Sequence, residues 1–349
     1  MSSAPPSLLA ACFLVACADA TPPPQPPPPP EPPPAQARPA QIATNPQPDL
    51  PPDVEQVLGA VIRDDLKCGY GDVAVCTAHC DEGDAASCAA LSAILLSGYG
   101  VPKDEPRART LAERSCAAGS LRGCNVLAVA LEHGLAGPKD EQRALSLYHR
   151  ACDGGEPRGC TNLASVVLEG RLGLTRDPAA AALIYQKACN GGVAAACVSA
   201  GALLCPGNGP REDHALAASL FRKACDAGDL AGCNGLGTSY ARGTGVPQDD
   251  ARAVSLYRRA CDGGNGAGCK GLGDMAQLGP QADPAESARY YQRSCDLKYA
   301  GGCSNLGYLL VVGRGVQKDE ARGMALLRDG CKTKHAWACQ RLKELGEPR

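Results

Sequence analysis

The chain has 349 residues, a formal net charge of −2 and a sequence pI of about 6.2. This charge provides no basic block that would neutralise phosphates, so the sequence argues against a nucleic-acid partner. Only 4% of the residues are aromatic, so a core must be built mainly from Ala, Leu, Val and Cys. No apolar run reaches the length of about 18 residues that a membrane-spanning helix needs.

The chain begins with a short apolar run over residues 7–16, which has the length of a signal-peptide core. It ends in Leu14-Val15-Ala16-Cys17, which resembles the bacterial lipobox. The resemblance predicts a lipoprotein signal peptide over residues 1–17, lipidation of Cys17 and membrane attachment through that anchor alone. No Lys or Arg precedes the apolar run, so a plain secretory signal stays the alternative.

A proline-rich segment follows, and we assign residues 18–53 to it. Sixteen prolines lie between residues 22 and 52. Such a sequence cannot build a core and favours extended polyproline II structure. The segment is expected to be a disordered stalk that lifts a folded module, residues 54–349, away from a membrane.

The folded module is dominated by pairs of cysteines that are spaced Cys-x7-Cys. From Cys80 onward the first members step by 36, 36, 37, 36, 36, 34 and 36 residues, which indicates one supersecondary unit repeated in tandem. Zinc ligands usually lie about two to four residues apart, so we predict disulfides in an oxidising compartment and no metal or other cofactor. The predicted pairs are Cys68–Cys76, Cys80–Cys88, Cys116–Cys124, Cys152–Cys160, Cys189–Cys197, Cys225–Cys233, Cys261–Cys269, Cys295–Cys303 and Cys331–Cys339.

Each unit is predicted to contain two helices. One follows an Asp that lies twelve residues before the first cysteine, a helix N-cap by residue type. Apolar and small residues at Asp+4, +7 and +11 form one helix face, and the aromatic residues at Asp+8 are expected in the core. A Gly three residues after the first cysteine ends this helix in most units, whereas Lys298 and Lys334 replace it in the last two. The second cysteine opens the other helix.

The repeat resembles Sel1-like repeats, which are relatives of tetratricopeptide repeats. The pattern Ala-x-x-Leu-Tyr-x-x-Ala-Cys stands at residues 144–152 and 253–261, and Cys-x-x-Leu-Gly stands at 233–237, 269–273 and 303–307. The cysteine spacing resembles the Helicobacter cysteine-rich proteins. This resemblance implies an all-α fold, an α/α right-handed superhelical solenoid of about eight disulfide-stapled hairpins that closes with a capping helix in residues 332–349.

The resemblance also suggests functions. The first is an extracytoplasmic scaffold in a bacterial cell envelope, periplasmic, on the outer membrane or secreted, which binds a protein, a peptide or peptidoglycan on its concave face. The alternative is weak β-lactamase or penicillin-binding activity, but no serine has a Lys three residues on, and the five histidines are scattered. We therefore predict no catalytic residue. A purely structural envelope protein is the third hypothesis.

Two further features concern binding. An asparagine stands near the start of the second helix in four units, and these four amides are candidate ligands for an extended peptide: Asn125, Asn162, Asn234 and Asn305. Capping of their own helices is an equally good interpretation. Cys205 is the odd thiol left by the pairing, either a bland free cysteine or one that pairs with another chain.

Overall fold

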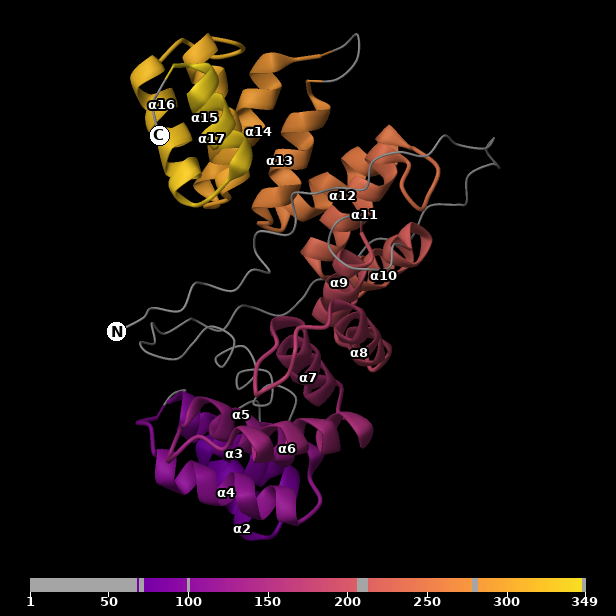
Figure 1. Cartoon of the computed structure of the whole chain (residues 1–349), viewed down its shortest axis with the longest axis vertical. Coiled ribbons are helices and arrows are strands. Elements are labelled where there is room, and N and C mark those ends of the chain that lie inside the picture. Colours follow the sequence, from indigo (N-terminus) through magenta and orange to yellow (C-terminus); the bar gives the residue numbers. More distant parts are fainter. Residues whose placement is uncertain (1–67, 69–71, 99–100, 206–212, 278–281, 347–349) are drawn as a thin grey trace. The chain divides into compact units, whose positions relative to one another are not determined.

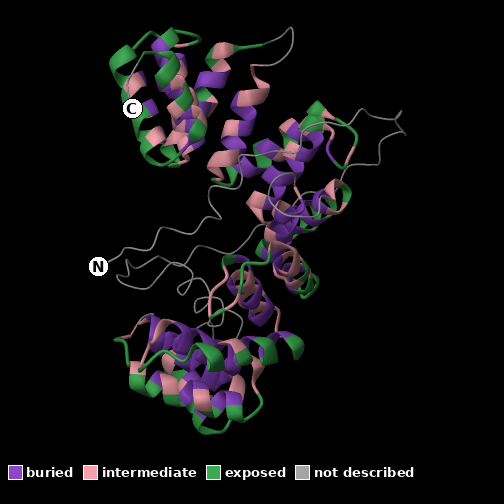
Figure 2. Ribbon diagram, viewed as in Figure 1, coloured by how far each residue is buried: buried purple, intermediate pink, exposed green. Residues whose placement is uncertain are grey.

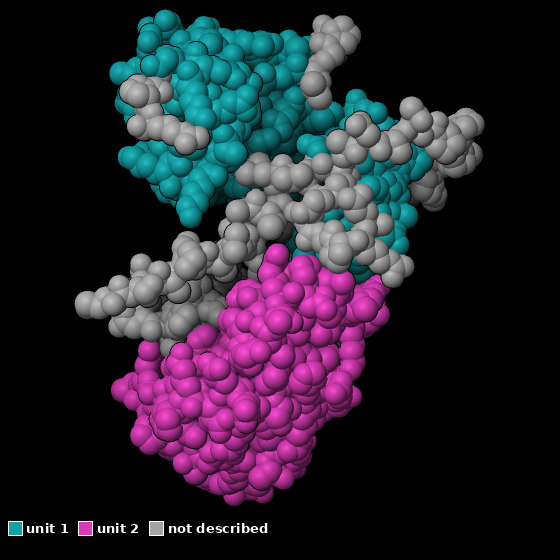
Figure 3. Space-filling model, viewed as in Figure 1, with its two compact units in different colours: residues 1–23, 194–349 teal, residues 24–193 magenta. Residues whose placement is uncertain are grey.

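The computed structural model describes residues 68, 72–98, 101–205, 213–277 and 282–346 (Figure 1). The predicted signal peptide, Cys12, Cys17 and the stalk lie outside the described residues. The chain divides into two compact units, residues 24–193 and residues 1–23 with 194–349 (Figure 3). In the described residues none of the helices is long and apolar enough to cross a membrane.

The described residues form sixteen helices, α2 to α17, and no strand, so the all-α prediction is confirmed. Every repeat has an A helix, which contains the second cysteine of a pair, and a B helix, which ends near the first cysteine of the next pair. The A helices are α3 (Ala85–Ser97), α5 (Leu121–His133), α7 (Pro157–Glu169), α9 (Ala194–Leu203), α11 (Leu230–Arg242), α13 (Gly266–Met275) and α15 (Ala300–Val312).

The B helices alternate with them. They are α4 (Glu105–Ala117), α6 (Glu141–Asp153), α8 (Pro178–Asn190), α10 (His214–Asp226), α12 (Asp250–Asp262), α14 (Pro284–Asp296) and α16 (Glu320–Lys332). A helix of the B type, α2 (Val73–Asp81), precedes α3, and a helix of the A type, α17 (Ala336–Glu344), follows α16.

The B helices begin where the sequence predicts. Each is capped by an Asp whose carboxylate accepts hydrogen bonds from the first-turn N–H groups. These caps are Asp104, Asp140, Asp177, Asp213, Asp249, Asp283 and Asp319. At the other end the predicted glycines, such as Gly119 and Gly264, have positive φ angles of 90° and 95°. Lys298 and Lys334 adopt the same left-handed region, at 62° and 63°.

The core of each repeat lies between its A and B helices. The aromatic residue at Asp+8 is buried in five repeats, at Tyr148, Tyr185, Phe221, Tyr257 and Tyr291, as predicted. Small residues on the A helix let these rings approach. A Cβ added at Gly273 would lie 2.5 Å from the ring of Tyr291, and one added at Gly237 would lie 3.0 Å from the ring of Tyr257. Large residues there would force the two helices apart.

The A and B helices differ in exposure (Figure 2). The helices α3 and α5 are buried along nearly their whole length, whereas the B helices expose a charged side. Within each unit, successive A helices pack against one another more closely than successive B helices do. We call the surface formed by the A helices the A-helix face.

Candidate functional site: the repeat junctions and the A-helix face

Eight cysteine pairs are joined with Cα–Cα distances of 4.3–4.7 Å, and all except the first lie at junctions between B and A helices. They are Cys68–Cys76, Cys80–Cys88, Cys116–Cys124, Cys152–Cys160, Cys225–Cys233, Cys261–Cys269, Cys295–Cys303 and Cys331–Cys339. Cys189 and Cys197 are also in the disulfide-bonded state. Cys205 lies just after α9 and is partly buried. From Cys80–Cys88 onward each bridge fixes the end of one repeat to the start of the next, whereas Cys68–Cys76 fixes α2 to the chain that precedes it.

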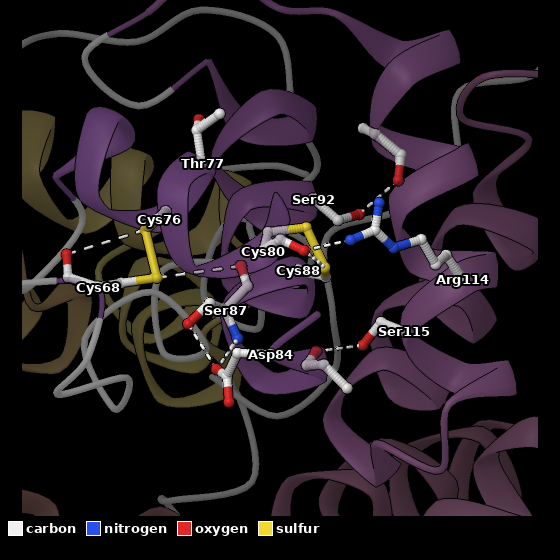
Figure 4. The surroundings of a disulfide bond; sticks show 12 residues. Cys68, Cys76, Thr77, Cys80, Asp84, Ser87, Cys88, Ser92, Arg114 and Ser115 are labelled. Carbon is white, nitrogen blue, oxygen red and sulfur yellow. Dashed lines mark hydrogen bonds between the residues drawn. A yellow bond between two sulfur atoms is a disulfide. The ribbon is translucent and has the colours of Figure 1, made fainter. Parts of the chain in front are cut away.

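A second contact at these junctions escaped the sequence analysis. An arginine two residues before the first cysteine of a pair reaches back to the preceding repeat and donates to the backbone carbonyl of its first cysteine. Arg150 bonds Cys116 O at 3.3 Å, and Arg259 bonds Cys225 O at 2.9 Å. Arg293 and Arg114 make the same contact, the latter with Cys80 O (Figure 4). A cation at a helix C-terminus is favourable because the last carbonyls carry partial negative charge.

The four predicted asparagines do not form one ladder. In residues 24–193, Asn162 Nδ2 of α7 donates to Asn125 Oδ1 of α5 at 2.8 Å, so this hydrogen bond joins two successive repeats. The remaining nitrogen of Asn125 is buried without a hydrogen-bond partner. In the other unit the side chain of Asn234 is buried within α11, and Asn305 Nδ2 lies 3.4 Å from Asp274 Oδ1.

The capping interpretation of these asparagines is wrong. Ser120, Glu156 and Asp229 cap α5, α7 and α11 through their side chains, and Tyr299 precedes α15 without a side-chain cap. The asparagines lie inside the helices, one or two residues after the second cysteine. The amides of Asn125, Asn162 and Asn305 contact side chains of neighbouring helices instead of their own first turns.

A buried polar network lies beside the asparagine pair. Tyr148 Oη donates to Glu132 Oε2 at 2.7 Å, and the guanidinium of Arg171 pairs with the other oxygen of Glu132. Glu132 is only 7% exposed, and these two partners satisfy its carboxylate oxygens. The three residues come from α5, α6 and the loop after α7, and they tie neighbouring repeats together.

A different set of side chains gathers on the A-helix face of α13, α15 and α17. We call it the C-terminal patch, and it consists of Lys270, Asp274, Asn305, Tyr308, Trp337 and Arg341. Lys270 Nζ lies 2.5 Å from Asp274 Oδ2, and Asn305 connects this pair to the next helix. The guanidinium of Arg341 lies 5.3 Å from the ring centroid of Tyr308 and 5.2 Å from that of Trp337. Tyr308 and Trp337 contact each other edge to face, at 5.8 Å.

The C-terminal patch is partly exposed, and its supports are buried. All six residues have intermediate exposure. Beneath them Tyr291 Oη donates to Asp274 Oδ1 at 2.7 Å, and burial together with the Asp274 charge raises the pKa of Tyr291. His335 Nδ1 lies 3.1 Å from Ser304 Oγ, and burial, followed by the charge of Lys270, lowers the His335 pKa. The patch is thus held in place by neutral, hydrogen-bonded side chains.

The described residues contain no group of three or more His, Cys, Asp or Glu side chains that could hold a metal ion. The hydroxyl of Tyr257 is held in its neutral form: burial raises the pKa of Tyr257 to about 12, and its hydroxyl lies 3.0 Å from Thr238 Oγ1. What the A-helix face offers is aromatic surface, amides and paired charges. Such groups are suited to contacts and hydrogen bonds.

Comparison with known proteins agrees with this architecture. The family description of the Sel1 repeat matches residues 85–120, 121–156, 157–193, 194–229, 230–265, 267–299 and 300–331. The chain belongs to the Sel1 repeat family. Each matched segment is one A helix followed by one B helix, and α2 and α17 flank the seven repeats. No curated protein sequence matches the chain.

Solved structures share the fold. A protective antigen of uropathogenic Escherichia coli with an SLR fold has 23% identity and a TM-score of 0.62, and the alignment covers 84% of this chain and 64% of the antigen. A Sel1 repeat protein of Oxalobacter formigenes has 21% identity and a TM-score of 0.58, and the alignment covers 84% of this chain and 85% of the Oxalobacter protein. Cysteine-rich protein B of Helicobacter pylori has 28% identity over 36% of this chain and 90% of its own, with a TM-score of 0.30.

Proposed function

We propose that this Sel1 repeat protein is an extracytoplasmic scaffold that binds a protein or peptide on its A-helix face. Sel1 repeat proteins mediate protein–protein interactions, and the number of disulfides indicates an oxidising compartment. The observation that carries the proposal is the C-terminal patch, where Tyr308, Trp337 and Arg341 stack on one another while staying partly exposed. Tyr, Trp and Arg are the residue types that dominate binding energy at protein interfaces.

In the unit of residues 24–193, the asparagine pair supports the A helices of that unit as a binding surface. The buried Nδ2 of Asn125 has no partner, and an unpaired buried donor costs free energy. Asn125 is only 1% exposed, so a ligand carbonyl would recover that cost only after the side chain turned outward. Backbone carbonyls of an extended peptide are spaced regularly and suit such donors.

The location of the protein is part of the proposal. The tetrapeptide at residues 14–17 supports attachment of a lipid to Cys17, and the proline-rich residues 18–53 support a stalk between the membrane and the repeats. Metabolic labelling with an alkyne-bearing fatty acid tests the anchor. Labelling of the wild-type chain and loss of the label in Cys17→Ser is the expected result, and an unlabelled wild-type chain would contradict the anchor.

Binding is tested with matched variants. The mature protein, immobilised in oxidised form, is used to capture proteins from a bacterial envelope extract. The double variant Lys270→Ala/Arg341→Ala removes the two cations of the C-terminal patch, whereas Arg258→Ala removes an exposed cation from the B helix α12. We expect a specifically captured protein to be lost by the double variant and retained by the control, at equal thermal stability. Equal capture by all three proteins would exclude the A-helix face.

A further inference from the structure

A second surface, on the opposite side of the C-terminal repeats, has the form of a binding groove. It lies between the B helices α14 and α16, with the A helix α15 and the loop after it as the remaining walls, and it has a volume of about 840 Å³. Apolar side chains line part of it: Val316 is partly exposed, and the core residues Leu306 and Leu310 reach it with the 3% and 5% of their surface that is exposed. Because successive B helices pack less closely than successive A helices, space is left between them here.

The loop that forms one wall is held in a fixed position. Gly313 ends α15 in the left-handed conformation, at φ 68°, and Gly315 follows at φ 73°. A Cβ added at Gly315 would clash with the backbone of Pro284 at the start of α14. The Gly-Arg-Gly-Val sequence therefore lets the loop rest directly on α14. The loop is fixed at Gly313, where α15 ends, and at Gly315, where it touches α14, so the groove is preformed.

The charged side chains of the groove are mostly cationic. Arg289, Lys318 and Arg322 line it, together with one carboxylate, Asp319. That carboxylate already caps α16 by accepting the N–H of Arg322 at 3.0 Å. Among the described residues, no carboxylate pairs with the guanidinium groups of Arg289 or Arg322.

The three cations are available to a ligand. Arg322 Nη2 donates to Gln292 Oε1 at 2.9 Å, which orients the guanidinium toward the groove without neutralising it. Lys318 pairs with Glu320 at 3.1 Å, but both side chains are more than 60% exposed. Such an exposed ion pair is worth little and is readily exchanged for another.

We infer that this groove binds an acidic peptide segment of a partner protein, in which Asp or Glu residues alternate with large aliphatic residues. The carboxylates would pair with Arg289, Lys318 and Arg322, and the aliphatic side chains would contact Leu306, Leu310 and Val316. The apolar lining favours a peptide over a sulfated or phosphorylated sugar, which has no group to fill it. The inference goes beyond the proposed function, since it places a second partner segment away from the A-helix face.

The inference is tested with the full mature chain and a short fluorescein-labelled peptide in which Glu and Leu alternate. Fluorescence anisotropy gives its affinity for the wild type, for Arg289→Glu/Arg322→Glu and for a control with the same charge change, Arg107→Glu/Arg258→Glu. All four arginines are exposed, so folding should be unaffected. We expect binding to weaken at least about tenfold in the groove variant and to change little in the control, because reversed charges repel the peptide.

Further arms make the result decisive. Lys318→Glu changes only the loop and should also weaken peptide binding. It replaces Arg289→Glu/Arg322→Glu as the test if that double variant proves unstable. The peptide with Gln in place of Glu should bind more weakly, and added salt should reduce the affinity of the acidic peptide. Equal affinity of the wild type and the groove variant, equally tight binding of a sulfated oligosaccharide, or loss of peptide binding in Lys270→Ala/Arg341→Ala would overturn the inference.

Discussion

The B helices are nearly uniform along the chain, whereas the A helices differ from repeat to repeat. Each B helix has 13 residues and an Asp cap. The A helices have 10 or 13 residues, and their N-caps include Asp84, Ser120, Glu156 and Asn265. Their polar and aromatic side chains range from the largely buried amide pair of α5 and α7 to the partly exposed aromatic patch of α15 and α17. The B helices with their disulfides thus build the frame, and apart from the groove between α14 and α16 it is the A helices that vary for recognition.

The largest expected effect on the frame comes from one junction. Cys225→Ser/Cys233→Ser removes a bridge that closes a loop of nine residues, and the unfolding free energy should fall by about 2.5 kcal/mol because the unfolded chain gains freedom. Denaturant unfolding under non-reducing conditions measures it. The single variant Cys205→Ser is the control and should change little; an unchanged midpoint in the double variant would mean that the bridge does not stabilise the frame.

The next effect concerns the arginines that reach back across a junction. Arg259→Ala removes the hydrogen bond to Cys225 O and should lower the unfolding free energy by about 1 kcal/mol. Its neighbour Arg258 is also exposed and serves as the control, since Arg258→Ala should have almost no effect. Equal effects of the two substitutions would show that the contact with the preceding repeat contributes nothing.

A smaller effect of opposite sign is expected at the turns that lack glycine. Lys298→Gly should stabilise the protein by about 0.5–1 kcal/mol, because a left-handed backbone is unfavourable for any residue with a Cβ. Gly264→Lys, the reverse change at the corresponding turn, should destabilise it by a similar amount. Thermal unfolding of both variants measures the difference, and a loss of stability in Lys298→Gly would contradict the strain.

The smallest effect is a pH dependence of the last repeat. Burial and the charge of Lys270 lower the pKa of His335, so the unfolded state binds the proton more readily than the folded state. Stability from this source is constant above the unfolded pKa of about 6.5 and falls as the pH decreases below it. The melting temperature of the wild type should drop more between pH 7 and pH 5 than that of His335→Gln, and identical profiles would show that His335 does not contribute.

Much of the frame was predictable from the sequence because its signals recur. The Asp caps, the glycine turns and the cysteine spacing each appear at fixed offsets in successive repeats. The arginine contact across the junctions carried a signal too. An arginine stands two residues before the first cysteine in four repeats, at Arg114, Arg150, Arg259 and Arg293. It was missed because a charged residue on a helix surface is normally only a solvated residue, and its partner lies in another repeat.

The recognition surface was predicted less well, for a geometric reason. Asn125 and Asn234 follow the second cysteine by one residue, but Asn162 and Asn305 follow it by two. One residue rotates a side chain by about 100° around a helix, so the four amides have different surroundings, and Asn125 and Asn162 meet although their offsets differ. The C-terminal patch could not be found by repetition at all, because Tyr308, Trp337 and Arg341 have no counterparts in the other repeats.

A scan with a photo-crosslinking amino acid tests most directly whether the A helices contact a partner protein while the B helices form the frame of the repeats. The residue is placed singly at Asn162, Asn305 and Tyr308 on A helices and at Arg107, Leu183 and Arg258 on B helices, in cells that export the protein. We predict crosslinks to a partner protein from the A-helix positions and none from those three B-helix positions. Crosslinks that arise only from the B-helix positions would contradict the assignment of recognition to the A helices.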